Sequence, residues 1–314
     1  MTKQLETNQR IKTIYTSLIA FILGYNVYTQ DTILPLWPKD AVPNRIETDE
    51  KEIREIGAIE IISYVQYPQI EVYLPSEANS TGKAMLIFPG GGYQILAYDW
   101  EGSDIAKFLN SKGIAGIVVK YRLPVSKSLV NNKMVPLQDA QRAIRLVRKM
   151  ANIWNFDNDR IGVIGFSAGG HLASTLGTHF DDEAYIKVDS TDLLSARPDF
   201  MALVYPVISF SAPSVHSGSK KALLGDKTDS ESIKYFSNEL QVSENTPPTI
   251  LFHAADDKGV PPENSLLFFE ALNQNGVPAE LHIYPEGGHG FSLATKNQSL
   301  GRWTQHLYEW TLGF

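Results

Sequence analysis

The chain has 314 residues and no cysteine, which excludes disulfides, thiolate metal sites and a cysteine nucleophile. Hydrophobic residues make up 43% and charged residues 20%, an ordinary balance for a globular protein with a sizeable core. Acidic residues outnumber basic ones by 35 to 28, for a formal charge of -7, and no basic run is present. Because phosphate binding needs clustered Lys and Arg, this composition argues against a nucleic-acid partner.

The first 29 residues have the pattern of an export signal. Lys3, Arg10 and Lys12 form a positive region, and a short apolar stretch follows over residues 14–27. This stretch falls below the roughly 20 residues that span a bilayer. We therefore predict a signal peptide over 1–29 and a periplasmic or extracellular mature protein without a membrane span. The alternative is an uncleaved anchor or an amphipathic first helix.

Residues 30–56 predict a lead-in segment, because three prolines and the charged run 47–52 are typical of an extended surface chain. Over 57–314, β-rich runs alternate with amphipathic ones, and no linker to a second domain is visible. Strands are expected at 59–64, 69–73, 84–88, 115–121, 160–164, 200–205, 249–253 and 279–284. Helices are expected at 104–110, 139–150, 172–176, 262–273 and 300–312.

The last six strands are mostly continuous apolar runs, as in strands covered on both faces, and the first two are expected to form an antiparallel edge. Alternating strands and helices favour parallel connections. The predicted fold class is therefore α/β, with a mostly parallel central sheet of about eight strands flanked by helices, in one catalytic domain over 57–314.

The most informative segment is a predicted strand that runs into Gly165-Phe166-Ser167-Ala168-Gly169 and then into a predicted helix. A nucleophile elbow of the α/β-hydrolase fold needs this order, because the tight turn holds the serine in strained backbone geometry and leaves no room for side chains beside it. The helix start adds a positive field for an oxyanion. We predict Ser167 as the nucleophile; the alternative is a glycine-rich turn with a bystander serine.

A serine nucleophile needs a base, and in this fold the partners follow in the order Ser, Asp, His. His289 lies in a glycine-rich stretch after a predicted strand and is the expected general base and acid. Asp257 precedes Val260-Pro261 by the Asp-x-x-Val-Pro spacing and is favoured as the residue that orients it. Asp256 is the alternative; otherwise it caps a loop or is solvated.

The remaining histidines have other expected roles. His253 and His282 lie inside predicted strands and are expected to be structural, whereas His171 lies one helical turn beyond the nucleophile and is expected to support the site. No histidine spacing indicates a metal site, and we expect no cofactor.

Three glycines follow the predicted strand 84–88, in Pro89-Gly90-Gly91-Gly92-Tyr93. A tetrahedral intermediate needs fixed N–H donors, so Gly91, Gly92 and Ala168 are the predicted oxyanion hole. A phosphate cradle is the alternative, but the lysine and Ser/Thr of a P-loop are missing.

Aromatic side chains are predicted to flank the site. Stacking on a sugar ring is a role open to them, and packing within their loops is the alternative. Glu101 and Asp99 flank a tryptophan and are expected to hydrogen-bond a sugar hydroxyl or to be surface charges. The candidate substrate-binding residues are Tyr93, Trp100, Glu101, Phe166 and His171, with Tyr98 as a further aromatic.

Together these motifs resemble the acetyl-xylan-esterase-like branch of α/β hydrolases, whose members are often labelled xylan or feruloyl esterases. The resemblance covers residues 57–314 and rests on Pro89-Gly-Gly-Gly-Tyr93, Asp99-Trp-Glu-Gly102, Tyr121-Arg-Leu-Pro124, Pro136-Leu-Gln-Asp-Ala-Gln-Arg142, Gly165-Phe-Ser-Ala-Gly-Gly-His-Leu-Ala173 and His253-Ala-Ala-Asp-Asp257. It implies export and the removal of acetyl, or sometimes aromatic acyl, groups from polysaccharides such as xylan.

The expected function is thus a serine carboxylester hydrolase that acts on an acylated carbohydrate, with acetyl favoured. A feruloyl esterase or a general small-ester carboxylesterase is the alternative. A serine peptidase is less favoured because no propeller repeat precedes the hydrolase region. A non-catalytic binding protein is less favoured because Ser167, Asp257 and His289 are all present. The sequence sets neither the polymer backbone nor the oligomeric state.

Overall fold

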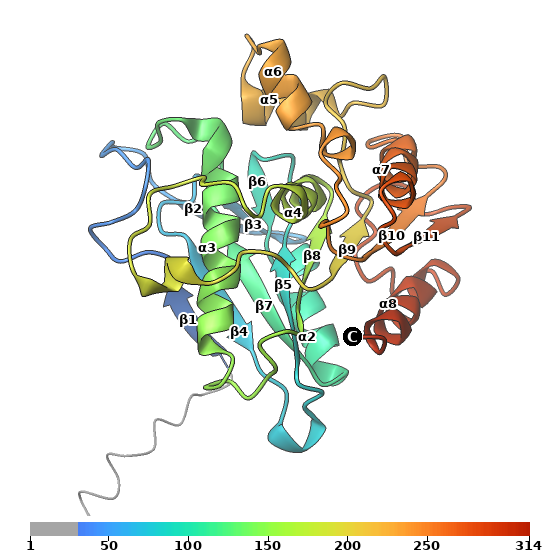
Figure 1. Ribbon diagram of the computed structural model, residues 1–314. Coiled ribbons are helices and arrows are strands. Elements are labelled where there is room, and N and C mark those ends of the chain that lie inside the picture. The colour runs from blue at the N-terminus through green and yellow to red at the C-terminus, as the bar shows by residue number, and fades with distance from the viewer. Residues whose placement is uncertain (1–30) are drawn as a thin grey trace, which may run out of the picture.

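A computed structural model describes residues 31–314 of the chain, so the predicted signal peptide over 1–29 lies outside the described residues. The main sheet has eight strands in the order β1–β4–β7–β5–β8–β9–β10–β11 (Figure 1). The two pairs β1–β4 and β4–β7 are antiparallel, and the other pairs are parallel. This confirms the predicted mostly parallel sheet of about eight strands. The bounds are β1 Asp31–Pro35, β4 Gln69–Tyr73, β7 Ile114–Lys120, β5 Lys83–Phe88, β8 Ile161–Phe166, β9 Met201–Val204, β10 Thr249–Ala254 and β11 Ala279–Tyr284.

Helices lie on both faces of this sheet. Crossovers between parallel strands are right-handed, so the direction in which the chain steps across the sheet decides which face its helix covers. The chain steps in one direction from β5 to β7 and in the other direction from β7 to β8 and on to β9, which places helices on both faces. In Figure 1, α3 and α4 cover the face toward the viewer, and α2 lies behind the sheet. The helices are α2 Asp104–Ser111, α3 Val135–Met150, α4 Ala168–Thr178, α5 Ser217–Leu224, α6 Ser230–Tyr235, α7 Glu263–Gln274 and α8 Trp303–Thr311.

The core lies between the central strands and these helices. Every residue of β5, β7 and β8 is buried, as their continuous apolar sequences predict. On α3 the buried stripe includes Ala140, Ile144 and Val147, and the charged Arg148 and Lys149 point away from it in the last turn. Burying a side chain such as Ile144 contributes roughly 1.5–3 kcal/mol relative to leaving it exposed.

The segment predicted as an extended lead-in is instead partly built into the fold. Its residues 31–35 form β1, which pairs with β4 along the sheet edge. Leu36 and Trp37 are buried at 1% and 3% exposure, and the Trp37 indole donates a 2.7 Å hydrogen bond to Asp139. Prolines are tolerated in an edge strand, because only one side of the strand needs N–H donors.

The predicted antiparallel edge of the main sheet is correct for residues 69–73, which form β4, and wrong for residues 59–64. Residues Glu60–Ser63 form β3, which belongs to a separate three-stranded sheet with β2 Ile53–Ile56 and β6 Ile95–Ala97. Its strand β6 connects the glycine-rich loop after β5 to the π-helical turn Asp99–Ser103. The small sheet therefore holds the start of that turn in place.

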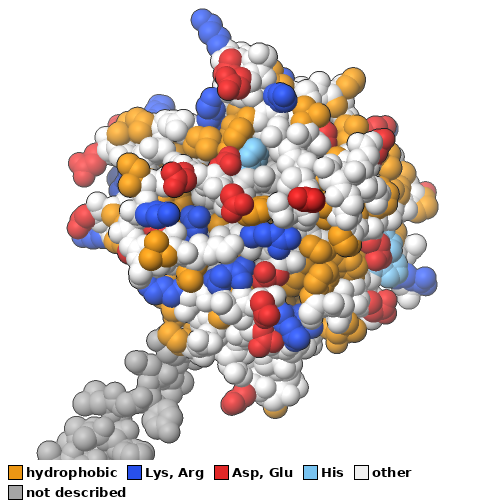
Figure 2. Space-filling model, in the orientation of Figure 1, with side chains coloured by type: hydrophobic (Ala, Val, Ile, Leu, Met, Phe, Trp, Pro, Cys, Tyr) orange, Lys and Arg blue, Asp and Glu red, His pale blue; other side chains and the backbone are white. Residues whose placement is uncertain are grey.

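A long insertion separates β9 from β10 and carries α5 and α6, which lie at the top of Figure 1. Neither helix was predicted from the sequence. On the face shown in Figure 2, basic and acidic side chains are interspersed and form no patch of a single sign. Within residues 31–314, no helix combines the length and apolarity needed to cross a bilayer.

Candidate active site

Ser167 lies between the last residue of β8 and the first residue of α4. Its backbone has φ 52° and ψ -118°, a conformation that non-glycine residues rarely adopt. Two hydrogen bonds hold it there: Ser167 N donates to the carbonyl of Val204 at 3.1 Å, and Val207 N donates to the carbonyl of Ser167 at 3.0 Å. Strain at this position is therefore maintained by the end of β9 and the residues that follow it.

The glycines on either side of Ser167 are required by close backbone approach. A Cβ on Gly165 would lie 2.2 Å from the carbonyl oxygen of Gly169, and a Cβ on Gly169 would lie 2.1 Å from the carbonyl oxygen of Phe88. Both distances are too short for any side chain. The Gly-x-Ser-x-Gly pattern thus follows from the packing of the elbow against the end of β5.

The structure brings Ser167, His289 and Asp257 into one hydrogen-bonded chain. The Ser167 hydroxyl Oγ is 2.8 Å from Nε2 of His289, and Nδ1 of His289 is 2.6 Å from Oδ2 of Asp257. Because a carboxylate only accepts hydrogen bonds, Nδ1 carries the ring proton and Nε2 is left to accept the proton of the serine hydroxyl. This arrangement can activate a nucleophilic oxygen.

The second oxygen of Asp257 fixes the carboxylate. Oδ1 accepts from the backbone N–H groups of Gly259 and Val260, each at 2.9 Å. Burial acts to raise the pKa of Asp257, but hydrogen bonds from His253, His289 and Val260 outweigh it and hold that pKa well below its usual value. Asp257 is therefore an anion beside the imidazole.

Asp256, the alternative to Asp257 as the residue that orients His289, binds different groups. Its Oδ1 accepts from the N–H groups of Gly287 and Gly288, at 2.8 and 2.7 Å. These residues directly precede His289. Asp256 therefore caps the histidine-bearing loop and makes no contact with the imidazole.

The glycine-rich loop after β5 lies against Ser167. A Cβ on Gly90 would lie 2.9 Å from the Cβ of Ser167. Gly91 and Gly92 have φ of 132° and 64°, which turn the backbone sharply. In the part of the chain that the structure describes, the N–H groups of Gly91, Gly92 and Ala168 have no hydrogen-bond acceptor. These three donors remain available to an oxyanion.

Four of the five candidate substrate-binding side chains are buried, and three of them pack against other side chains of the core. Tyr93, Phe166 and His171 are exposed by 1%, 0% and 0%, so the expectation that they contact a sugar disagrees with their packing. The Tyr93 hydroxyl is 2.9 Å from Nδ1 of His171, whose Nε2 is 2.9 Å from the carbonyl of Phe236. Because a carbonyl only accepts, Nε2 carries the proton and Tyr93 donates to Nδ1. This pair joins the glycine-rich loop to α4 and to the insertion.

Trp100 and Glu101 have different surroundings, although they are adjacent in the π-helical turn. Trp100 is 37% exposed, and its indole donates a 2.9 Å hydrogen bond to the carbonyl of Gly290, next to His289. Glu101 is only 4% exposed, so it is neither a surface charge nor open to a sugar hydroxyl. Tyr98 is also buried, at 2%. Among the aromatic candidates named, Trp100 is therefore the one that a substrate can reach.

Two residues that the sequence did not single out belong to the site's surroundings. Tyr205 follows β9 and packs edge-on against His289, with ring centroids 5.0 Å apart. His216 is half-buried at the start of α5; burial lowers its pKa, and the positive charge of His289 lowers it further. The end of the strand at 200–205 was a signal for Tyr205, because ligands bind beyond the carboxyl ends of parallel strands.

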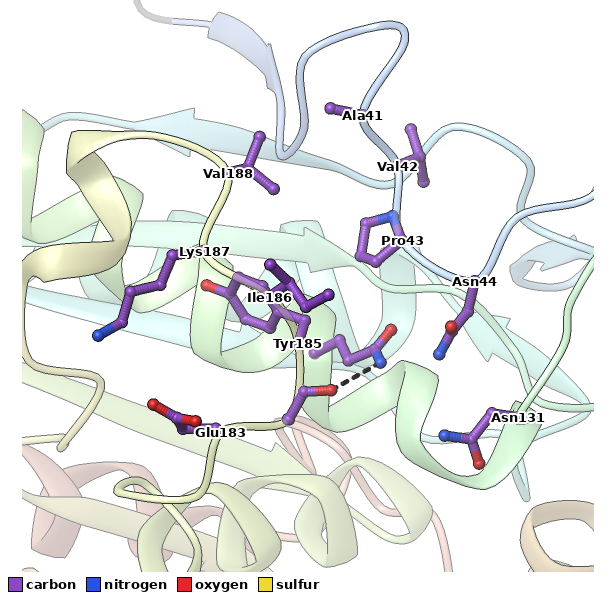
Figure 3. Close-up of a pocket in the computed structure, with 12 residues that line it drawn as sticks. Ala41, Val42, Pro43, Asn44, Asn131, Glu183, Tyr185, Ile186, Lys187 and Val188 are labelled. Atoms are coloured by element: carbon purple, nitrogen blue, oxygen red, sulfur yellow. Dashed lines mark hydrogen bonds between the residues drawn. The ribbon is translucent and has the colours of Figure 1, made fainter.

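A large surface hollow lies elsewhere. It has a volume of about 880 Å³ and lies between the loop 41–44, Asn131 and the segment 183–188 (Figure 3). Its lining contains no serine, histidine or aspartate. The volume of a hollow therefore does not identify the reactive centre in this protein.

Comparison with known proteins places the chain in a family. A profile of the family described as BD-FAE matches residues 70–272. The chain is 35% identical over 250 residues to an acetylxylan esterase of Xylanibacter ruminicola, a match that covers 76% of this chain and 48% of that protein. It is 36% identical over 232 residues to endo-1,4-beta-xylanase B of Butyrivibrio fibrisolvens, covering 74% of this chain and 36% of that protein. The chain thus spans half or less of the length of these two relatives.

The fold has a close counterpart among solved structures. An acetyl ester-xyloside bifunctional hydrolase from Caldicellulosiruptor lactoaceticus superposes with a TM-score of 0.78 and is 38% identical. The match covers 92% of this chain and 98% of the other. The similarity therefore extends over nearly the whole of both folds.

Proposed function

Because the chain belongs to the BD-FAE family of α/β hydrolases, we propose that it is a serine carboxylester hydrolase that removes acyl groups, with acetyl preferred, from xylan or xylo-oligosaccharides. The observation that carries this proposal is the 2.8 Å contact between Ser167 Oγ and Nε2 of His289, beside three backbone N–H groups that lack an acceptor among the described residues. This pairing supplies a nucleophile, its base and donors for an oxyanion.

In the acylation step, Ser167 Oγ attacks the ester carbonyl carbon while its proton moves to Nε2 of His289. The tetrahedral oxyanion accepts hydrogen bonds from Ala168, Gly91 and Gly92. Asp257 stabilises the imidazolium that forms. The bond between the carbonyl carbon and the sugar oxygen then breaks, His289 returns its proton to that oxygen, and the acyl group remains on Ser167.

In the deacylation step, a water molecule takes the place of the sugar. His289 accepts a proton from the water as its oxygen attacks the acyl carbon, and the same donors hold the second oxyanion. The bond to Ser167 Oγ breaks, and the serine regains its proton from His289. The products are the free carbohydrate hydroxyl and a carboxylic acid, acetic acid for an acetyl ester.

The carbohydrate part of the proposal draws on the relatives and on Trp100. The names of all three relatives refer to xylan or a xyloside. Trp100 presents a partly exposed ring beside the loop of His289, and an indole face suits the apolar face of a pyranose ring. A feruloyl esterase and a general small-ester carboxylesterase use the same catalytic groups and differ only in the acyl group and alcohol.

A substrate panel tests the proposal. Acetylated xylan, acetylated pectin, a feruloylated oligosaccharide and nitrophenyl acetate are each incubated with wild type, Ser167→Ala and the control Ser195→Ala at an exposed serine. We expect acetate release from acetylated xylan that Ser167→Ala reduces by about 10⁴-fold or more and that Ser195→Ala leaves unchanged. Hydrolysis of nitrophenyl acetate without release of any sugar-bound acetyl group would contradict the substrate, and retained activity in Ser167→Ala would contradict the mechanism.

We also propose that the protein is exported through cleavage of its N-terminal segment. The support is the positive region followed by the short apolar stretch 14–27. Expression of the full chain in a bacterium, fractionation of the cells and sequencing of the mature N-terminus test this. An intact Met1 on protein recovered from the cytoplasm would contradict it.

A further inference from the structure

Glu101 is a carboxylate in an unusual place. Its side chain is 4% exposed, and it makes no ion pair with Lys or Arg among residues 31–314. Instead, Oε2 accepts a 2.8 Å hydrogen bond from Gly90 N, and Oε1 accepts a 2.8 Å hydrogen bond from the Tyr205 hydroxyl. Burying a carboxylate without a cation costs stability unless its hydrogen bonds are complete. A buried carboxylate that persists at such a cost calls for a functional reason.

One oxygen of Glu101 fixes the glycine-rich loop. A Cβ on Gly90 would lie 2.6 Å from Oε2 of Glu101, 2.7 Å from the carbonyl of Phe166 and 2.9 Å from the Cβ of Ser167. Gly90 is therefore enclosed between Glu101 on one side and the nucleophile on the other. Its N–H is bound to Glu101, while the N–H groups of the next two glycines keep no acceptor within the described residues.

The other oxygen of Glu101 reaches the loop of His289 through Tyr205. The Tyr205 hydroxyl donates to Oε1 of Glu101 and accepts from the backbone N–H of Ser292 at 3.0 Å. The ring of Tyr205 packs edge-on against His289 and Phe291, with centroids 5.0 and 4.4 Å apart. The Tyr205 hydroxyl thus binds the backbone after His289, and the Tyr205 ring packs against the imidazole itself.

The residue before Glu101 makes the same connection with its own groups. The Trp100 indole donates to the carbonyl of Gly290 at 2.9 Å, and the Ser292 hydroxyl donates to the carbonyl of Trp100. The π-helical turn Asp99–Ser103 is therefore bonded to the glycine-rich loop through Glu101 and to the histidine loop through Trp100. These two loops are far apart in the sequence, since one follows β5 and the other follows β11.

We propose that Glu101 is a positioning residue, which fixes the distance between the oxyanion donors and His289 by binding Gly90 with one oxygen and, through Tyr205, the loop after His289 with the other. The inference rests on the proposed function, because it assigns Glu101 to the geometry of that reaction. Oxyanion donors act mainly in the transition state. Disturbing Glu101 is therefore expected to lower kcat and to change KM little.

The titratable groups that face His289 are Asp257, Glu101, Tyr205 and His216. Burial raises the pKa of Glu101 above its usual value, and the hydrogen bonds from Tyr205 and Gly90, followed by the charge of His289, offset only part of this rise. The readout that separates positioning from a purely structural role is therefore the division of the effect between kcat and KM.

The test compares Glu101→Gln and Tyr205→Phe with Asp192→Asn. Asp192 is the control, because it is also buried and accepts from a tyrosine hydroxyl, Tyr185, and a backbone N–H, Val188, at 2.7 and 2.8 Å. Unlike Glu101, it also pairs with Arg142 at 2.8 Å. Nitrophenyl acetate is the substrate, and titration with a covalent serine probe counts folded sites. We expect kcat per site to fall about tenfold to 100-fold in both Glu101→Gln and Tyr205→Phe, with KM changed by less than about threefold.

Asp192→Asn should lower Tm while keeping the wild-type kcat per site. The inference is overturned if kcat per site in Glu101→Gln stays within about twofold of wild type or if only KM rises. Failure of the proposed function gives a different result: wild type itself then shows no hydrolysis that depends on Ser167.

Discussion

His253 lies 3.3 Å from the same oxygen of Asp257 that binds His289. Its Nε2 is also 2.9 Å from the carbonyl of Val260, and its Nδ1 is 2.7 Å from the Ser265 hydroxyl. Since the carbonyl and the carboxylate only accept, Nε2 carries the proton and is shared between them. His253, within β10, thus gives Oδ2 of Asp257 a second donor besides His289.

Replacing His253 should therefore weaken catalysis without removing the triad. His253→Leu deletes a donor to a buried carboxylate, and hydrogen bonds to charged groups contribute about 1.5–3 kcal/mol. We expect kcat for nitrophenyl acetate to fall about tenfold as Asp257 becomes less fixed. His282→Leu in β11, whose imidazole binds Glu280, is the control. Equal losses in the two variants would contradict a role for the contact with Asp257.

The two neighbouring aspartates should differ sharply when each is changed to asparagine. Asp257→Asn replaces the acceptor of the Nδ1 proton and favours the wrong histidine tautomer, so kcat should fall about 10⁴-fold. Asp256→Asn keeps an oxygen for the N–H groups of Gly287 and Gly288, so a loss below about tenfold is expected. Steady-state kinetics of the two proteins check this, and a reversed order would reassign the triad.

Two adjacent glycines allow a second paired prediction. A Cβ on Gly91, at φ 132°, would lie 2.3 Å from the carbonyl oxygen of Ile95, whereas a Cβ on Gly92, at φ 64°, would meet nothing closer than 3.7 Å. Gly91→Ala must therefore move the loop and should reduce kcat by about 100-fold or more. Gly92→Ala adds only left-handed backbone strain of about 1–2 kcal/mol. Its Tm should fall while most of its kcat remains.

Burial lowers the pKa of His171 from 6.5 to about 4. The unfolded chain then binds a proton on this residue at a higher pH than the folded chain does. Stability is consequently lost as pH falls from about 6.5 toward 4, by about 3 kcal/mol once both states are protonated. In urea unfolding between pH 4 and 7, His171→Gln should show a smaller decrease than wild type. His306→Gln, in α8, serves as the control, and identical pH dependence in wild type and His171→Gln would contradict the assignment.

The parts of the site predicted from sequence are those with local signatures. The elbow around Ser167 combines an apolar strand, two glycines forced by close approach and a helix start, all within one short segment. His289 and Asp257 each follow an apolar strand in the order that the fold requires. The six strands of the main sheet from β5 onward were predicted because continuous apolar runs are typical of strands buried on both faces, whereas the short β6 of the small sheet was not predicted.

The parts that were missed depend on contacts between distant residues. Glu101 and Tyr205 are separated by 104 positions, and neither lies in a pattern that indicates the other. Sequence identifies aromatic residues near a loop but not the side on which each ring packs, so Tyr93 and Phe166 were placed with Trp100. The pairing of β1 was missed because short apolar stretches between prolines resemble an irregular surface segment.

That first strand has a consequence for any shortened form of the protein. β1 covers the outer side of β4, and Trp37 satisfies an oxygen of Asp139, which also binds Arg122. A protein trimmed to begin at residue 57 would expose the N–H and C=O groups along β4 and leave a gap over α3. Bare strand edges recruit other strands, so such a fragment would tend to self-associate and precipitate, although it still contains all the proposed catalytic residues.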